Sequence, residues 1–183
     1  MIKGGKLVGE FDDMYRDYAD PWNQSREKDR TDKAILLSIL RRISKREPMR
    51  VVDIGCGLGY FSAQISALGI PVLALDVSQE AIIRARELNP GPSYFIGDLL
   101  AQDLFKSFQP TIFVMAETTW YVLEKIMTFM AHLRSAYPEA YFLHALNFLP
   151  SGLQKYGREY FTDPDSMRTY FGLHYIEYGD ICF

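Results

Sequence analysis

The chain has 183 residues and a mass of 21.1 kDa, the size of one domain with a full hydrophobic core. Apolar residues make up 48% and aromatic residues 14%, a composition that excludes a largely disordered protein. The net charge of −3 and the pI near 5.6 disfavour nucleic-acid binding and favour a small or neutral partner.

Cysteine usage and hydropathy predict a cytoplasmic protein. The two cysteines are Cys56, which lies between glycines, and Cys182. A disulfide at Cys56 would freeze a loop that looks functional, so we predict two reduced thiols. The opening residues lack an apolar signal-peptide core, and no segment approaches 18 apolar residues. Secretion and membrane spanning are therefore not expected.

The first thirty residues differ from the rest of the chain, because they are polar and rich in aromatic side chains. We predict that residues 1–30 form a lid or helix across one edge or mouth of a domain spanning residues 31–183. The domain opens with a predicted amphipathic helix over 31–44, capped by Thr31 or Asp32 and ended by Pro48.

Strands and helices alternate through the remaining sequence. Further helices are predicted from Leu58 to Leu68, after the cap Ser78 as far as Leu88, from Val122 to Leu133, and after Thr162 or Asp163 with Pro164 in the first position. Strands are predicted over 49–54, 71–77, 93–98, 110–117, 140–148 and 173–183. This alternation predicts an α/β fold, a doubly wound, mostly parallel Rossmann-like sheet with helices on both faces.

Three glycines, Gly55, Gly57 and Gly59, follow the first strand and open a helix. Glycines there let the backbone approach a ligand closely, at the sheet edge where such ligands bind. Asp76 ends the next strand about twenty residues later, where a carboxylate accepts ribose hydroxyls. An adenosine-type ligand is therefore predicted. Tyr60 replaces the last glycine of the dinucleotide motif, and there is no G-K-[ST] triphosphate loop.

Asp53 lies two residues before the first of these glycines. A carboxylate there would repel a pyrophosphate but suits a ligand that carries an ammonium group. S-adenosylmethionine has ribose, adenine, an α-amino group and a sulfonium, and it has no phosphate. The pattern therefore favours this donor, with S-adenosylhomocysteine as its product.

These motifs resemble class I S-adenosylmethionine-dependent methyltransferases over about residues 33–149. "VVDIGCGLG" looks like the first motif, "LALDVS" the second, "IGDLL" the third and "PTIFVMAETTWYV" the fourth. The resemblance implies that Asp98 stands near the adenine amino group and that Glu117 lines the pocket. The predicted cofactor-binding residues are Asp53, Gly55, Cys56, Gly57, Gly59, Asp76, Val77, Asp98, Leu99, Glu117, Tyr15 and Trp22.

"YADPWN" in the N-terminal segment is similar to the nodulation-type N-methyltransferases and related small-molecule methyltransferases, in which this segment covers the cofactor. The aromatic rings of Tyr15 and Trp22 would attract a sulfonium, or else they pack the segment onto the sheet. Arg30 is either a surface residue or a fork that binds a carboxylate.

The chain departs from the family at its end. The family closes its seven-stranded sheet with a hairpin, whereas only the segment 173–183 follows the fifth strand and its helix here. Either the sequence stops short of the last strand of the usual seven, or the segment 173–183 takes the neighbouring slot alone. In both cases an edge is left uncovered or is covered by a partner, as in a dimer.

Methyl transfer from a sulfonium is an in-line displacement, so the protein chiefly positions the reactants. A hydroxyl acceptor needs a base, for which His144 and Glu117 are the candidates; an amine needs only to arrive neutral. No residues have metal-ligand spacing, so no metal is predicted. The predicted function is methylation of an amine or hydroxyl of a small polar metabolite such as a sugar. The alternative is cofactor binding without catalysis, as a sensor or partner subunit. "AETTWY" stands where an N-P-P-Y-like loop would indicate a nucleic-acid or protein substrate.

Overall fold

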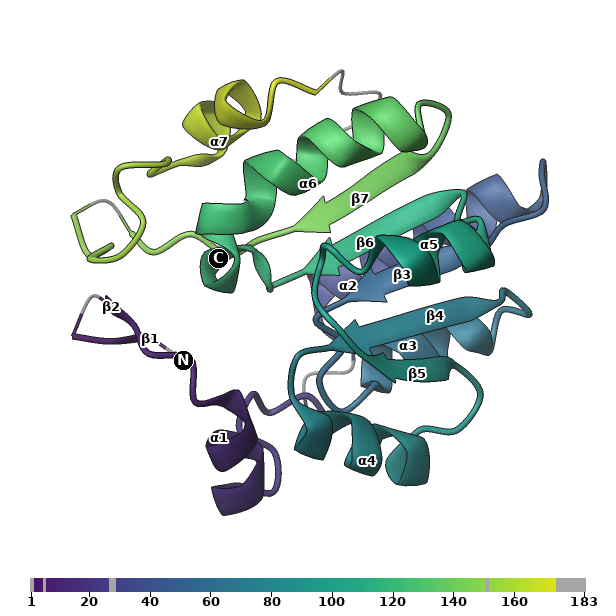
Figure 1. Ribbon diagram of the computed structural model, residues 1–183, viewed down its shortest axis with the longest axis horizontal. Coiled ribbons are helices and arrows are strands. Elements are labelled where there is room, and N and C mark those ends of the chain that lie inside the picture. Colours follow the sequence, from purple (N-terminus) through teal and green to yellow (C-terminus); the bar gives the residue numbers. More distant parts are fainter. Residues whose placement is uncertain (1, 5, 27–28, 151, 174–183) are drawn as a thin grey trace.

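The computed structural model describes residues 2–4, 6–26, 29–150 and 152–173. Its centre is a five-stranded sheet in the order β5-β4-β3-β6-β7, and every neighbouring pair is parallel. The strands are β3 (Val51–Ile54), β4 (Val72–Asp76), β5 (Ser93–Ile96), β6 (Ile112–Ala116) and β7 (Tyr141–Ala145). This arrangement confirms the predicted doubly wound parallel sheet (Figure 1).

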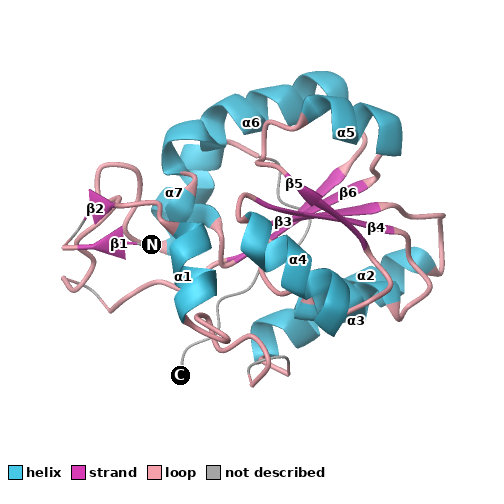
Figure 2. Ribbon diagram, turned by 60° about the horizontal axis from the view of Figure 1, so that its bottom comes forward, coloured by secondary structure: helices cyan, strands magenta, loops and turns pink. Residues whose placement is uncertain are grey.

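Helices cover both faces of the sheet (Figure 2). One face carries α2 (Thr31–Ser44), α3 (Tyr60–Ser66) and α4 (Gln79–Leu88), and the other carries α5 (Gln102–Phe108), α6 (Leu123–Ala136) and α7 (Pro164–Phe171). Successive strand residues point to opposite faces. Thus Val51 packs in the α2–α4 core and Val52 in the α5–α7 core, and both are fully buried. Burial on both faces explains why these strands are continuous apolar runs.

Two of the three predicted helix caps are confirmed. The hydroxyl of Ser78 accepts a bond from the amide of Ala81 (3.1 Å) at the start of α4. Asp163 caps α7 in a reciprocal capping box with Ser166, and Pro164 is the first helical residue. The predicted cap of α2 by Thr31 or Asp32 is wrong. Both residues are already helical, and the carboxylate of Asp32 is bonded to the Arg30 guanidinium (3.0 Å) instead of to a backbone amide.

Several elements were not predicted. They are the short hairpin β1 (Ile2–Lys3) and β2 (Lys6–Leu7), the helix α5 and the 3-10 turn η1 (Thr119–Tyr121). Helix α1 (Phe11–Asp17) lies within the predicted N-terminal lid or helix of residues 1–30. Of the predicted strand over 173–183, residues 174–183 lie outside the described residues. Within the part of the chain that the structure describes, no helix is long and apolar enough to cross a membrane.

The N-terminal segment returns to the domain beside α4, where α1 lies in both views (Figures 1 and 2). Asp12 of α1 accepts bonds from the Ser78 hydroxyl (2.7 Å) and the Glu80 amide (3.2 Å). Arg84 of α4 donates to the carbonyls of Tyr15 (2.8 Å), Tyr18 (3.1 Å) and Ala19. These contacts hold the segment at the carboxyl end of β4.

Candidate functional site

The candidate site lies at the carboxyl ends of the parallel strands, to which the arrowheads point in Figure 1. The glycine loop follows β3, Asp76 ends β4, Asp98 follows β5 and Glu117 follows β6. The chain order reverses between β3 and β6, and open α/β sheets bind ligands in the crevice at such a switch point. The fold therefore gathers the predicted residues at one edge.

Asp76 organises the glycine loop. Its Oδ2 accepts a bond from the Gly57 amide (2.9 Å), and its Oδ1 accepts one from the Ser78 amide (2.9 Å). The residue is buried, and burial raises the pKa of its carboxyl although these amides oppose the shift. The Val77 amide also interacts with the carboxylate, and the acceptor capacity that remains is what the ribose hydroxyls of an adenosine would need.

The chain's own side chains occupy the space that the three glycines leave open. A Cβ on Gly55 would lie 2.3 Å from the Thr118 hydroxyl, and one on Gly59 would lie 2.3 Å from the Tyr94 hydroxyl. At Gly57, a Cβ would lie 2.6 Å from both the Gln24 carboxamide oxygen and the Tyr15 hydroxyl. The glycines are thus required for internal packing around the loop, a role that the sequence did not reveal.

Asp53 is buried beneath the loop, 3% exposed, and accepts a 2.5 Å bond from the Ser62 hydroxyl. Burial raises the pKa of its carboxyl to about 6, against the lowering effect of Ser62 and of the Lys33 ammonium. A buried carboxylate of this kind is stabilised by a nearby cation. Cys56 is a buried free thiol whose pKa is raised by burial, so it is not a ready nucleophile.

The loops after β4 and β5 carry the predicted adenine-side residues. Asp98 accepts bonds from the Leu100 amide (2.8 Å) and the Lys125 ammonium (2.7 Å). Partial burial opposes the shift, but these bonds lower the pKa of its carboxyl. Leu99 is buried in the α5–α7 core, whereas Val77 is 50% exposed beside Asp76.

Glu117 follows β6 and lies on the other side of the glycine loop from Asp98, in a left-handed conformation (φ 64°). We call the space between the glycine loop and Glu117 the mouth of the site. Its carboxylate accepts bonds from the Arg30 guanidinium (3.2 Å) and the Asn147 amide (3.3 Å). Burial raises the pKa of this carboxyl, and Arg30 opposes the shift. The structure therefore connects Glu117 to the N-terminal segment through an ion pair across 87 residues of sequence.

Aromatic side chains of the N-terminal segment reach the mouth. Tyr121 contacts Phe11 edge-on (5.6 Å between ring centroids) and Trp22 in a tilted arrangement (5.4 Å). Burial and the nearby Glu117 raise the pKa of Tyr121 to about 12. Tyr15 is buried against Leu58, with Trp22 packed beside it. Tyr15 and Trp22 thus pack beside the glycine loop, and their contact with the cofactor stays a prediction.

His144 lies on the α5–α7 face of β7. Its Nε2 is 2.6 Å from the buried Thr119 hydroxyl, and its ring stacks on Phe142 and meets Phe171 edge-on. Burial lowers the pKa of His144 to about 4. These contacts are typical of a neutral packing residue, and of the two predicted bases they favour Glu117.

Sequence reasoning missed three residues of this site. Gln24 crosses the glycine loop, Tyr121 is the centre of the aromatic contacts, and Lys33 is 8% exposed and placed to interact with Asp53. Of these three residues, Lys33 alone had a sequence signal: it is a charged residue on the apolar face of α2, four residues before Leu37.

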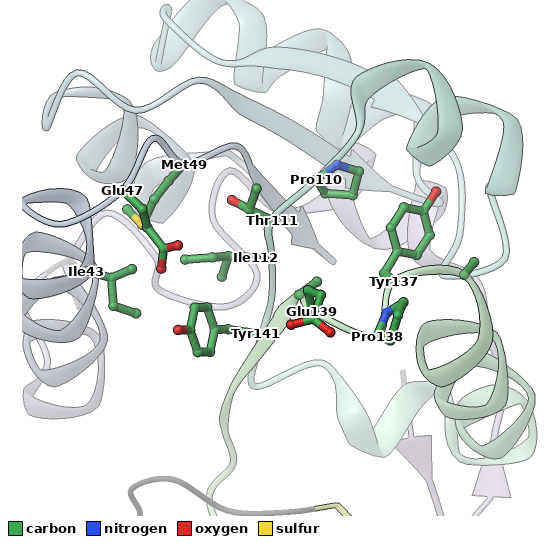
Figure 3. Close-up of a pocket in the computed structure, with 12 residues that line it drawn as sticks. Ile43, Glu47, Met49, Pro110, Thr111, Ile112, Tyr137, Pro138, Glu139 and Tyr141 are labelled. Carbon is green, nitrogen blue, oxygen red and sulfur yellow. The ribbon is translucent and has the colours of Figure 1, made fainter.

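A cavity of about 330 Å³ lies at the opposite edge of the sheet, where β3, β6 and β7 begin (Figure 3). Met49, Thr111, Glu139 and Tyr141 line it, far along the strands from the glycine loop. A second cavity of about 330 Å³ follows the carboxyl end of β7, between Phe148, Gln154 and Arg158. Only the second one lies at the edge that carries the candidate site.

The donor set of the site fits an adenosyl ligand with an ammonium group. Carboxylates end β4 and follow β5, Asp53 lies below the loop, and the loop itself offers backbone groups without a lysine or arginine of its own. Among the described residues, no three His, Cys, Asp or Glu side chains could hold a metal ion together. Fold and site therefore define an α/β protein whose donor set suits a nucleoside ligand that carries an ammonium group.

Comparison with known proteins identifies the class. Residues 52–137 match the family described as "Methyltransferase domain". The match supports the predicted class, a class I S-adenosylmethionine-dependent methyltransferase, and with it S-adenosylmethionine as the cofactor.

The individual relatives match over shorter stretches of the chain or at lower sequence identity. A malonyl-[acyl-carrier protein] O-methyltransferase from Erwinia billingiae (strain Eb661) is 40% identical over 58 residues, which is 32% of this chain and 23% of that protein. The PH0226 protein from Pyrococcus horikoshii OT3 has a similar structure (TM-score 0.60, 19% identity, 87% of this chain and 69% of that one). The plantazolicin methyltransferase BamL, solved with a triazolic desmethylPZN analog and SAH, shares the fold (TM-score 0.52, 21% identity, 61% and 44%). The chain spans about a quarter of the length of the curated relative from Erwinia billingiae.

Proposed function

We propose that this protein transfers a methyl group from S-adenosylmethionine to a small acceptor held between the glycine loop and Glu117. The observation that carries the proposal is the buried Asp76 carboxylate bonded to the Gly57 amide, in a loop with Asp53 beneath it. This is an acceptor-rich site for a ribose and an ammonium group, within a matched methyltransferase domain.

In this proposal the residues act mainly by positioning. The bound cofactor supplies a methyl group attached to a positively charged sulfur. Asp76 orients the ribose, Asp98 and Leu99 border the base, and Asp53 balances the positive charge from below. Tyr15 and Trp22 wall the mouth against water, since their rings already pack around the loop. Alignment of the acceptor with the methyl group then provides most of the acceleration.

Glu117 is the residue that we assign to the acceptor. Its carboxylate is 28% exposed at the mouth, and burial holds its pKa above the ordinary value, so it can take a proton from an acceptor. An amine or hydroxyl of a small polar metabolite, such as a sugar, suits this carboxylate. His144 remains the second predicted base, although it packs on the aromatic side of β7.

A second candidate acceptor is suggested by the curated relatives, which are named as acting on malonyl-[acyl-carrier protein]. A carboxylate acceptor requires a cation, and Arg30 stands at the mouth. However, Asp32 and Glu117 already bond its guanidinium, at 3.0 and 3.2 Å, and both would repel an acidic acceptor. We therefore favour the amine or hydroxyl.

Other parts of the proposal concern the whole chain. Residues 1–30 act as the lid of a domain over residues 31–183, and the protein works in the cytoplasm with reduced thiols, as monomer or as dimer through a sheet edge. Cofactor binding without catalysis, as a sensor or partner subunit, is the alternative function.

The test is a transfer assay with methyl-labelled cofactor against panels of amines, sugars and malonyl thioesters, with S-adenosylhomocysteine binding measured in parallel. We expect transfer to an amine or hydroxyl, reduced about tenfold to a thousandfold in Glu117→Gln and unchanged in the exposed Glu124→Gln. Binding without transfer to any panel would favour the sensor, and absence of binding would refute the proposal.

A further inference from the structure

The carboxamide of Gln24 forms a bridge across the glycine loop. The amide of Leu58 donates to Gln24 Oε1 (2.7 Å), and Gln24 Nε2 donates to the Cys56 carbonyl (3.3 Å). One side chain thus satisfies a donor and an acceptor on either side of Gly57. The Leu58 amide needs such a partner, because an unpaired buried N–H costs free energy, whereas the Cys56 carbonyl also accepts a bond from the Gly59 amide (3.0 Å).

Gly57 and this bridge depend on each other. Gly57 is left-handed (φ 55°), and a Cβ there would lie 2.6 and 2.7 Å from the two polar atoms of the Gln24 carboxamide. The Tyr15 hydroxyl would be equally close, at 2.6 Å. A residue other than glycine at position 57 would therefore displace the Gln24 carboxamide. The bridge forms only because position 57 has no side chain.

The segment that carries Gln24 is itself held in a fixed turn. The Asp20 carboxylate accepts bonds from the Gln24 amide (2.8 Å), the Ser25 amide (2.7 Å) and the Ser25 hydroxyl (2.7 Å). Burial opposes the shift, yet these bonds lower the pKa of Asp20. Beyond this turn, Arg84 ties the carbonyls of Tyr15 and Tyr18 to α4. The bridge therefore joins a well-anchored turn to the loop.

We propose that Gln24 is a positioning residue of the cofactor site. It holds Cys56 to Leu58 in the conformation in which Asp76 also bonds the Gly57 amide, so that docking of the segment 20–25 and binding of the cofactor stabilise each other. By linkage, a cofactor bound at the loop strengthens the docking of this segment by the same factor. The inference rests on the proposed cofactor site and adds the residue through which the N-terminal segment acts on it.

Two substitutions separate the two hydrogen bonds. Gln24→Met preserves the length of the side chain and removes both bonds, whereas Gln24→Glu keeps an acceptor for the Leu58 amide and sets a carboxylate against the Cys56 carbonyl. The control is Gln102→Met, an exposed position at the start of α5. The measurements are hydrogen exchange of the Leu58 amide in the protein without ligand, and calorimetry with S-adenosylhomocysteine.

We expect the Leu58 amide to exchange about tenfold faster in Gln24→Met and near the parental rate in Gln24→Glu and the control. S-adenosylhomocysteine should bind about tenfold more weakly to Gln24→Met, which is the loss expected from two modest hydrogen bonds. It should also slow exchange of residues 20–25 in the parent. If Gln24→Met does not fold, Gln24→Glu carries the test. S-adenosylhomocysteine should bind this variant more weakly than the parent, because the new carboxylate faces the Cys56 carbonyl.

Parental exchange at Leu58 in Gln24→Met would overturn the inference, and so would equal or tighter ligand binding by that variant. Tighter binding would show that Gln24 competes with the ligand. If the parent binds no S-adenosylhomocysteine, the proposed function fails, while the Leu58 exchange rates still decide the role of Gln24.

Discussion

Asp76 has two tasks that a single side chain can combine because a carboxylate has four lone pairs. The Gly57 and Ser78 amides use two of them, the Val77 amide also interacts with the carboxylate, and the remaining acceptor capacity is available to a ligand. Asp76→Asn replaces one oxygen by an NH2 group, which would face a backbone N–H. We expect S-adenosylhomocysteine affinity to fall about tenfold to a hundredfold, measured by calorimetry, because a hydrogen bond to a charged group is lost.

The matched control for Asp76→Asn is Asp103→Asn, an exposed carboxylate in the first turn of α5. This variant should bind the ligand as the parent does. Affinity of Asp76→Asn within threefold of the parent, in a protein with an unchanged circular dichroism spectrum, would contradict the assigned role.

Asp53 makes stability depend on pH. Its ordinary pKa is 3.8, and burial raises it to about 6 in the folded protein. The proton is therefore held more tightly by the folded state, so the stabilisation is complete below pH 4 and is lost as the pH rises through 6. In Asp53→Asn this titration is absent. We expect the difference in unfolding free energy, parent minus variant, to fall by about 1–3 kcal/mol between pH 4 and 7.

Urea unfolding of the parent and of Asp53→Asn at several pH values measures this difference. The contributions of the other carboxyl groups cancel to the extent that they titrate alike in both proteins. The change of this difference with pH is the quantity to compare, because Asp53→Asn also removes the counter-charge of Lys33 and so lowers the stability of the variant at every pH. A difference that is flat from pH 4 to 7 would show that Asp53 titrates normally in the fold.

At the scale of elements, α4 is both a wall of the site and the support of α1. The Ser78 hydroxyl accepts from the Ala81 amide and donates to Asp12 of α1. We expect Ser78→Ala to lower the free energy of unfolding by about 1–2 kcal/mol, since it removes an N-cap and a bond to a carboxylate. Urea denaturation measures the loss.

Ser78→Thr keeps the hydroxyl and serves as the control for this cap, with a smaller loss expected from the added methyl group at a fully buried site. If both substitutions destabilise the protein equally, packing at position 78 dominates and the cap contributes little.

The elements that the sequence predicted well have strong local signals. Helix α4 has a serine cap and α7 has an aspartate cap followed by proline, and both begin where expected. Helix α5 has no side-chain cap, and Phe105 is its one fully buried side chain. Its apolar periodicity is therefore too short to detect, because the packing that stabilises it comes from Phe113 of β6, 5.4 Å away between ring centroids.

At the scale of the whole molecule, the predicted site depended on local chain geometry. Residues that end or follow consecutive parallel strands must share one edge, so Asp76, Asp98 and Glu117 were predictable from their positions. Gln24 was not predictable, because its bonds to the loop span 32 and 34 residues and need the N-terminal segment to return. His144 was placed at the correct strand, but its orientation towards Phe171 of α7 follows from packing after β7.

A ligand that binds the folded state alone stabilises the entire domain, so binding is also a prediction about the whole molecule. At one hundred times its dissociation constant, S-adenosylhomocysteine should add about 2.7 kcal/mol, which raises the melting temperature of a chain of this length by about 7 °C. NADH and ATP should give no comparable rise, because the buried Asp53 carboxylate beneath the loop would repel phosphates and Tyr60 replaces the last glycine of the dinucleotide motif. Thermal scans of the parent and Asp76→Asn, at equal ligand concentrations, test this. A rise with ATP as large as that with S-adenosylhomocysteine would contradict this prediction and would mean that the site accepts nucleotides generally.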